Sequence, residues 1–250
     1  MGDIIIINNV SLANFNQISS EREKRGLGFR LSLYTADPGQ LIVTIPTVAH
    51  EALHLFLNDL IREKTGEMGV PLRDLQSVGA GTFTNHDDGD VRSWGEGDSC
   101  LRPHGRLLVN GFPTVVIEAG YTQSLGSLQQ KARWWFAASH FNVKIVILAK
   151  VYQSRGGRIT IEKWKAVPQA QANAPAQLEA ACVQSIHITY HALANNPADP
   201  ALYDVTAALH LEFVDVYLRQ PVGHEGDIVI DVEELQTYAV DFWLTMGNEQ

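Results

Sequence analysis

The stretch that decides the fold runs from Phe112 to Phe136 and reads FPTVVIEAGYTQSLGSLQQKARWWF. The apolar residues 113–117 predict a buried strand, and this strand ends at the carboxylate of Glu118. A turn is expected next, followed by a helix over residues 124–139 that returns Lys131 alongside the strand. The rest of the chain is expected to pack around this strand, turn and helix.

The residues after this unit predict its partner strands. VKIVILAKVY (143–152) and RITIEKW (158–164) are apolar or alternating segments separated by a Gly-Gly turn. A strand, a helix and a second strand in this order predict a crossover connection. The strand that ends at Glu118 and the strand 143–152 are therefore expected to be parallel neighbours in one sheet.

The residues before this unit predict two strands, a helix and two shorter strands. The expected strands 29–35 and 40–46 are joined by a turn at Asp37-Pro38-Gly39 and are placed at an edge of the sheet. A helix is expected over 46–64, because its apolar residues recur with helical spacing. The segments 75–84 and 91–103 are expected to be strands, and the second carries Asp98.

The two ends of the chain are less patterned. The charged run SSEREKRG at 19–26 predicts a solvated segment that leads into the fold. The Ala-, Gln- and Pro-rich segment 168–181 predicts a surface loop. The remaining expectations are a strand at 183–192, a loop at 195–204, a strand or mixed element at 208–218 and a helix at 232–246.

The chain has 250 residues, enough to bury a core without covalent staples. We find no internal repeat and no linker long enough to divide it. One α/β domain over 1–250 is expected, with an extension at 1–27, a core at 28–165 and a C-terminal embellishment at 166–250.

The composition of the chain limits which partners and which cellular compartment are expected. The net charge of −9 weighs against nucleic-acid binding, because such proteins usually cluster Lys and Arg against phosphates. The two cysteines, Cys100 and Cys182, do not form a disulfide framework, so a reducing compartment and two small buried residues are expected. No apolar run approaches the roughly 18 residues that cross a bilayer. The sequence predicts an intracellular protein, cytoplasmic or nuclear, without a membrane partner.

Three carboxylates are candidates for one metal site. Glu118 ends an apolar strand, where an acid is costly unless it binds a cation or hydrogen-bond donors. Asp98 follows Gly97 in a neighbouring strand, and Glu51 lies on the early helix. Converging acids suit a hard cation such as Mg²⁺, which can lower the pKa of an attacking water. Lys131 could then orient that water and offset charge on a phosphate. Alone, Glu118 at a strand end and Asp98 in a tight GEGD turn are also consistent with purely structural roles.

Four segments together resemble the PD-(D/E)XK nuclease superfamily, whose fold is restriction-endonuclease-like. They are QLIVTIPTVAHEALHLFL, EGDSCLRP, PTVVIEAGYTQSLGSLQQKARWW and the strands VKIVIL and ITIEKW. The sequence is most similar to putative-endonuclease families in which an acid precedes a strand pair, a strand ends in an acid, and a helix after a serine-containing turn bears a basic residue. The resemblance covers residues 28–165 and implies an α/β fold with a mixed central sheet flanked by helices.

The resemblance also implies site residues. Asp98 matches the first motif acid and Glu118 the second, both as ligands of Mg²⁺ or Mn²⁺, with the Ala119 carbonyl as a further ligand and Glu51 as an assisting acid. The third motif position, usually lysine, is Gly120. Lys131 is the expected substitute, and Lys144 is a second candidate. The resemblance thus implies Asp98, Glu118, Lys131 and Glu51 as catalytic residues, and Asp98, Glu118 and Ala119 as metal ligands.

The function implied is hydrolysis of phosphodiester bonds in nucleic acid, with DNA favoured over RNA. Because Gly120 departs from the motif, a catalytically degenerate nuclease fold that acts as a binding or assembly module is the alternative. Self-association into a homo-oligomer is left open.

A rival motif lies on the early helix. His50, Glu51 and His54 form an HExxH pattern, which sets two imidazoles one turn apart with a glutamate beside them, as in zinc metalloproteases. The extended metzincin pattern is absent from the sequence, and no third ligand is evident. The structural alternative is that His50 caps or packs at the helix start and His54 is partly buried.

The pair Trp134-Trp135 lies on the second expected helix. Adjacent tryptophans could stack on bases. Neighbouring helical positions point in different directions, however, so one is expected to enter the core and the other to cover it.

Overall fold

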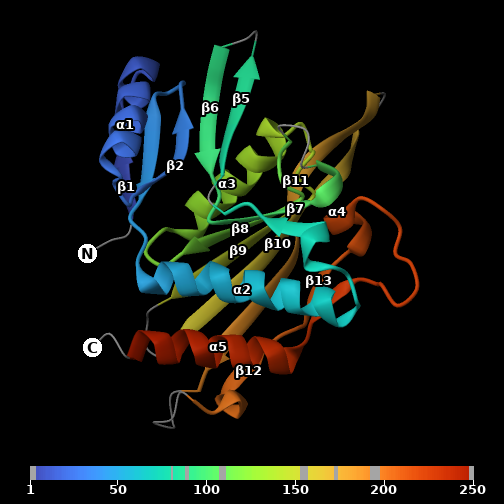
Figure 1. Ribbon diagram of the computed structural model, residues 1–250. Coiled ribbons are helices and arrows are strands. Elements are labelled where there is room, and N and C mark those ends of the chain that lie inside the picture. The colour runs from blue at the N-terminus through green and yellow to red at the C-terminus, as the bar shows by residue number, and fades with distance from the viewer. Residues whose placement is uncertain are drawn as a thin grey trace.

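The central feature of the protein, seen in a computed structural model, is a seven-stranded mixed sheet in the order β12-β11-β10-β9-β8-β7-β4 (Figure 1). The structure describes residues 4–79, 81–87, 90–106, 111–152, 157–171, 174–191 and 198–247. The strands of this sheet are β4 (Leu75–Ser77), β7 (Ser99–Pro103), β8 (Val115–Gly120), β9 (Ile145–Tyr152), β10 (Arg158–Gln171), β11 (Ala174–Tyr190) and β12 (Tyr203–Val205).

Strand β8 lies inside this sheet, and all six of its residues are buried. It pairs in parallel with β9 and antiparallel with β7. Helix α3 (Leu125–Ala138) connects β8 to β9, and the Ser124 side chain caps its start by accepting a hydrogen bond from the Ser127 N–H. The predicted strand, helix and parallel strand are confirmed.

Alternation along β8 separates two apolar layers. Val115, Ile117 and Ala119 belong to the cluster covered by α2 (Val48–Glu67) and α5 (Val232–Gly247). Val116 belongs to the cluster under α3. Figure 1 shows α2 and α5 side by side across one face of the sheet, with α3 on the other. This is the expected α/β architecture, a mixed central sheet flanked by helices.

A second sheet of five strands lies beside the first in the order β1-β3-β2-β6-β5. Its strands are β1 (Ile4–Ile7), β3 (Gln40–Thr44), β2 (Arg30–Thr35), β6 (Asp90–Glu96) and β5 (Thr82–Asp87). The strands predicted at 29–35 and 40–46 are present, but they lie inside this second sheet, so the expected edge position is wrong. The physical reason is that β1 covers one side of the hairpin and β6 the other.

Helix α1 (Leu12–Arg25) covers the second sheet. Phe15 stacks on Tyr34 and meets the edge of Trp94. The charged run at 19–26 has no buried residue, as its predicted solvation requires, but it forms the second half of this helix and Arg22 pairs with Glu96.

The two sheets are joined where β6 leads into β7. The predicted strand 91–103 is two strands, which belong to different sheets, and Asp98 lies in the link between them. The predicted strand 75–84 likewise divides into β4 and β5. Gly97 lets the link pass close to the core, because an added Cβ would lie 2.5 Å from Cys100 Sγ.

The prediction of a surface loop at 168–181 is wrong. β10 and β11 continue through this segment as a long antiparallel hairpin, with pairs such as Val167 with Glu179 and Gln169 with Gln177. Alanine and glutamine give weak strand signals, but each strand here pairs with the other over almost its whole length, and this pairing overrides local propensity. Residues 172–173 lie outside the described part.

The C-terminal region contains short elements that cover the sheet. They are β13 (Leu209–Leu211), α4 (Phe213–Tyr217), β14 (Ile228–Ile230) and α5. The mixed element at 208–218 and the final helix are therefore confirmed. The predicted loop at 195–204 falls partly on undescribed residues 192–197, and the rest contains η3 (Pro200–Leu202) and the start of β12. The remaining 3-10 turns are η1 (Leu72–Asp74) and η2 (His104–Arg106).

Both cysteines are free, as expected, but only Cys100 is buried. Cys182 is exposed on β11, so its expected burial is wrong. Burial raises the pKa of the Cys100 thiol well above its usual value, which makes it a packing residue rather than a nucleophile. Of the helices in the described ranges, none is both long and apolar enough to span a membrane.

Replacing Gly97 with alanine should destabilise the fold by about 1–3 kcal/mol, because the new methyl group would overlap Cys100 Sγ and crowd Trp135. Gly126 is the matched control, since it lies on α3 with open space around its Cα. Gly126→Ala should leave stability unchanged or raise it by up to about 1 kcal/mol. Urea unfolding of both variants measures the difference, and equal stabilities would contradict the close packing at the link.

Candidate functional site

The two motif acids meet at one end of the central sheet. Ser99 on β7 pairs with Ile117 on β8, so continuing the register by one residue brings Asp98 beside Glu118. The Ala119 N–H donates to Asp98 Oδ2 at 2.8 Å, which ties the link to the end of β8. The predicted contribution of the Ala119 carbonyl as a metal ligand stays a prediction, since the observed contact uses its N–H.

Glu118 is a buried acid held at both oxygens by α3. Lys131 Nζ donates to Oε2 at 2.6 Å, and Trp135 Nε1 donates to Oε1 at 2.6 Å. Burial, opposed by the charge of Lys131 and reinforced by the charge of Asp98, raises the pKa of Glu118 to about 7. Glu118 therefore changes charge near neutral pH.

Lys131 reaches the site, as the sequence suggests it should, but it is not open to solvent. Its ammonium donates to Ser32 Oγ at 2.7 Å and to the Glu96 carbonyl at 2.9 Å as well as to Glu118. These three bonds use all three of its N–H groups. Its side chain is only 2% exposed. Lys144, the second candidate, instead donates to the main-chain oxygen of Phe141.

Packing accounts for the glycine at position 120. A Cβ on Gly120 would lie 2.7 Å from Leu128 Cδ1 on α3. A side chain there would require Leu128 to shift and would crowd the Gln123 carbonyl at 3.3 Å, so the close approach of helix and strand favours glycine. Lys131 brings an ammonium to Glu118 from the helix that fills this space.

Asp98 is buried among donors. Its Oδ1 accepts from Arg30 Nη1 at 2.9 Å and lies 3.1 Å from His50 Nε2. Burial alone would raise the pKa of Asp98, but His50, Lys131 and His54 outweigh it and hold that pKa well below its usual range. Asp98 is therefore ionised at neutral pH.

Arg30 is a site residue that the sequence patterns did not identify. It binds Asp98 through one guanidinium nitrogen and both oxygens of Glu51 through another, at 2.7 and 2.9 Å. It stands at the start of β2, where a lone arginine in an apolar strand is the one signal that could have marked it. Glu51, the predicted assisting acid, thus joins the site through Arg30.

A β-bulge positions the second missed residue. The β2–β3 register shifts between Leu31 and Leu33, which leaves Ser32 unpaired with β3. Bulges redirect side chains next to functional sites. Here the Ser32 hydroxyl accepts from Lys131.

Glu96, two residues before Asp98, completes the buried charges. Both of its oxygens bind Arg22 of α1, at 2.7 and 2.9 Å, and Oε2 also accepts from the Leu31 N–H at 3.1 Å. The position of Glu96 two residues before Asp98 is a sequence signal that could have marked it as a site residue. Its pairing with Arg22 could not be read from spacing, because Arg22 is 74 residues away.

The site is open at Glu51 and closed at Glu118. The exposed fractions of the side chains fall from 32% at Glu51 and 16% at Arg30 to 3% at Asp98 and 1% at Glu118. Four carboxylates (Glu51, Glu96, Asp98 and Glu118) face three permanent cations (Arg22, Arg30 and Lys131). The cluster therefore holds one more carboxylate than it has permanent cations. Arg30 lies at its partly exposed end.

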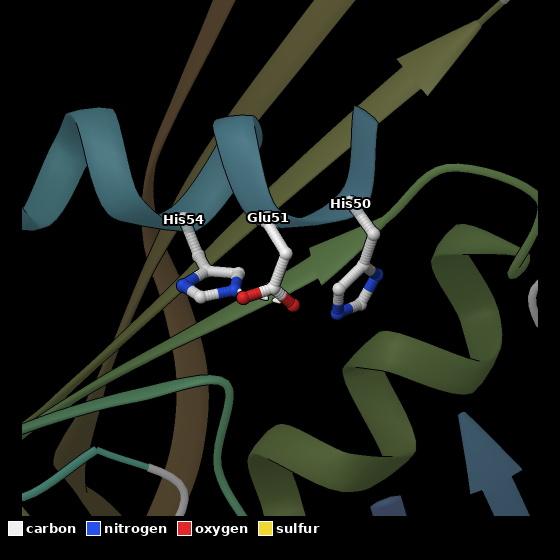
Figure 2. Close-up of side chains that lie close together, drawn as sticks. All are labelled: His50, Glu51 and His54. Carbon is white, nitrogen blue, oxygen red and sulfur yellow. Dashed lines mark ion pairs between the residues drawn. The ribbon is translucent and has the colours of Figure 1, made fainter. Parts of the chain in front are cut away.

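Figure 2 shows the HExxH residues on one side of α2, and His50 Nε2 on that side lies 3.1 Å from Asp98 Oδ1. Both imidazoles are only 1% exposed, so the expectation of a partly buried His54 is wrong. The backbone N–H of His50 donates to Thr47, which caps the helix. Arg30 engages the Glu51 carboxylate, so that carboxylate is not free to act as the general base of a protease.

Of the tryptophan pair, Trp135 is fully buried and Trp134 is partly exposed. Trp134 donates to Ser93 at 2.8 Å and Trp135 donates to Glu118. The division predicted for this pair is confirmed, and base stacking by Trp135 is excluded by its burial.

No protein-family model matches the sequence, and no curated protein matches it. The chain is similar to the crystal structure of a putative nuclease belonging to DUF820 from Anabaena variabilis ATCC 29413. The two sequences are 12% identical, the match covers 79% of this chain and 87% of that chain, and the TM-score is 0.40. A likeness this weak does not establish a shared family or activity.

Arg30→Gln should destabilise the protein by about 3 kcal/mol, because it leaves buried Asp98 without its guanidinium partner. Arg25 is a matched control, since it binds Glu21 at the same distance of 2.7 Å on an exposed surface. Arg25→Gln should cost less than about 1 kcal/mol. Denaturant unfolding measures both, and a small loss for Arg30→Gln would contradict a buried ion pair.

Glu118 should make stability depend on pH. Because its pKa rises from 4.5 when unfolded to about 7 when folded, its protonated form is favoured by folding. That contribution, about 3 kcal/mol, is complete below pH 4.5 and is lost as pH rises through 7.

The measurement is unfolding of the parent and of Glu118→Gln between pH 4.5 and about 8 with a chelator present. The stability of the parent relative to the variant should fall with rising pH. A constant difference would show that Glu118 does not titrate in this range.

Proposed function

We propose that the protein is a metal-dependent nuclease that hydrolyses phosphodiester bonds in nucleic acid, with DNA favoured as substrate. The observation that carries the proposal is the meeting of Asp98 and Glu118 at the end of β8, with Lys131 2.6 Å from Glu118. The sequence resemblance predicts these three groups from their order alone, and helix α2, strands β7 and β8, helix α3 and strand β9 occur along the chain in the order it implies.

The donor set suits Mg²⁺ or Mn²⁺, because both acids offer oxygen atoms. Each oxygen of Glu118 accepts one of the described hydrogen bonds, and a carboxylate oxygen can take a second partner. The excess carboxylate also favours a bound cation. Asp98 and Glu118 would hold the ion, with the Ala119 carbonyl as the remaining proposed ligand. When bound, such an ion polarises a phosphodiester and acidifies water.

The chain's own residues supply the other parts. Arg30 lies at the mouth and can bind a phosphate through its guanidinium, whose planar fork matches phosphate oxygens. Lys131 can hold an attacking water or offset charge once its bond to Glu118 loosens. Glu51, the most exposed of the acids, orients Arg30 through two bonds. Substrate binding therefore requires Arg30 to exchange a carboxylate for a phosphate.

Glu118→Gln tests the activity with little change in side-chain volume. Supercoiled plasmid DNA and a structured RNA are incubated with the protein and Mg²⁺ or Mn²⁺. We expect the parent to cleave at least one substrate and Glu118→Gln to cleave at least about a hundredfold more slowly, because it loses an anionic ligand.

Glu162→Gln is the matched control. Glu162 is a buried acid that also accepts from a tryptophan N–H, Trp164 Nε1, but it lies on β10 away from Asp98. This variant should cleave like the parent. No cleavage by the parent with either metal, or equal cleavage by Glu118→Gln, would reject the enzyme.

The closed state of Glu118 favours one second candidate. Since both oxygens are bound by α3 and the side chain is 1% exposed, the fold could serve as a binding or assembly module without catalysis. This candidate would be supported over the nuclease if calorimetric titration with Mg²⁺ and with Mn²⁺ showed no binding and size-exclusion chromatography showed self-association.

A further inference from the structure

We propose that the first two turns of α2 hold a transition-metal ion through His50, Glu51 and His54. One ligand atom from each residue can be chosen so that all three atoms lie within 4.8 Å of one another. Figure 2 shows the three side chains on one side of the helix, with the Glu51 carboxylate between the two rings. This inference does not rest on the nuclease proposal, although Glu51 takes part in both.

His54 provides the second, independent observation. Its side chain is 1% exposed, yet Nε2 has no hydrogen-bond partner within the described residues. Glu51 Oε1 lies 3.4 Å from this nitrogen. A buried polar atom without a hydrogen bond is costly, and a metal ion between this nitrogen and the carboxylate would remove that cost.

The other nitrogen of His54 is already oriented. Nδ1 lies 2.8 Å from Ser99 Oγ. A ring that binds metal through Nε2 must carry its proton on Nδ1, and Ser99 can accept that proton's hydrogen bond. Supporting bonds of this kind fix the tautomer of metal-binding histidines.

His50 has an equivalent support. Its Nε2 lies 3.1 Å from Asp98 Oδ1, and its side chain is also 1% exposed. A carboxylate at this distance can orient the ring or serve as a fourth ligand. The ring centroids of His50 and His54 are 5.6 Å apart, and a nitrogen of each ring lies within 4.8 Å of the other, close enough for one ion to reach both.

The chemistry selects the class of metal. Two imidazoles and a carboxylate suit Zn²⁺, Co²⁺, Ni²⁺ or Mn²⁺, whereas Mg²⁺ prefers oxygen atoms. Glu51, 32% exposed, gives the ion a route from solvent. Its bonds to Arg30 must loosen as the ion binds, since both compete for the same oxygens.

Co²⁺ is the probe, because its visible absorption reports the ligands around it. The full-length protein is stripped with a chelator and titrated with Co²⁺, and Zn²⁺ is then added to displace it. We expect one equivalent to bind with absorption typical of nitrogen and oxygen ligands. His54→Ala and Glu51→Gln should each weaken binding at least about tenfold.

His224→Ala is the control, because His224 is exposed in a loop far along the chain. It should bind Co²⁺ like the parent. Circular dichroism establishes that each variant is folded, and Glu51→Gln remains informative if the buried His54→Ala is not, since Glu51 is partly exposed.

The site would be overturned by no saturable Co²⁺ or Zn²⁺ binding, by unchanged affinity in folded Glu51→Gln, or by an equal loss in His224→Ala. Loss of Co²⁺ in Glu118→Gln but not in Glu51→Gln would place the ion at the motif acids instead and would also overturn it. The cleavage assay with Mg²⁺ is separate, so failure of the nuclease proposal leaves these results unaffected.

Discussion

The constraint on which the structure depends is the cost of burying negative charge. Asp98, Glu118 and Glu96 are each at most 4% exposed, and an unpaired carboxylate in such surroundings would protonate or unfold the region. Each is matched instead by a cation from another element: Arg30 from β2, Lys131 from α3 and Arg22 from α1. These pairs contribute little net stability compared with apolar packing, but losing any single partner is costly. They therefore fix how the elements fit together more than they add to the total free energy of folding.

The second sheet has a direct part in this arrangement. Its strand β2 supplies Arg30 and the bulged Ser32, and β6 supplies the Glu96 carbonyl that accepts from Lys131. The β6–β7 link then delivers Asp98 to the end of β8. The central sheet and α3 alone would leave Lys131 with one of its three described bonds. Residues of both sheets are thus needed to form the site.

Local patterns in the sequence predicted the central unit well. The apolar run before Glu118 has the length of a buried strand, and the residues after Ser124 have helical spacing and a cap, so β8 and α3 appear where expected. The positions of Asp98, Glu118 and Lys131 relative to these elements follow from the same patterns. Their roles in catalysis and metal binding stay predictions.

What the sequence did not reveal depends on contacts between distant residues. Arg30 meets Asp98 across 68 positions and Ser32 meets Lys131 across 99, distances at which spacing carries no information. The β10–β11 hairpin was missed because its alanines and glutamines favour a strand only when paired. The exposed Cys182 lies on the same hairpin.

The two hydrogen bonds that α3 donates to Glu118 also restrict the orientation of the helix. Lys131 and Trp135 lie one turn apart on the helix and each holds a different oxygen of the same carboxylate. A shift of one residue in the sequence of α3 rotates its side chains by about 100° and would remove both donors together. Glu118 therefore fixes the rotation of α3 about its own axis as well as its distance from β8. A single hydrogen bond would leave that rotation free.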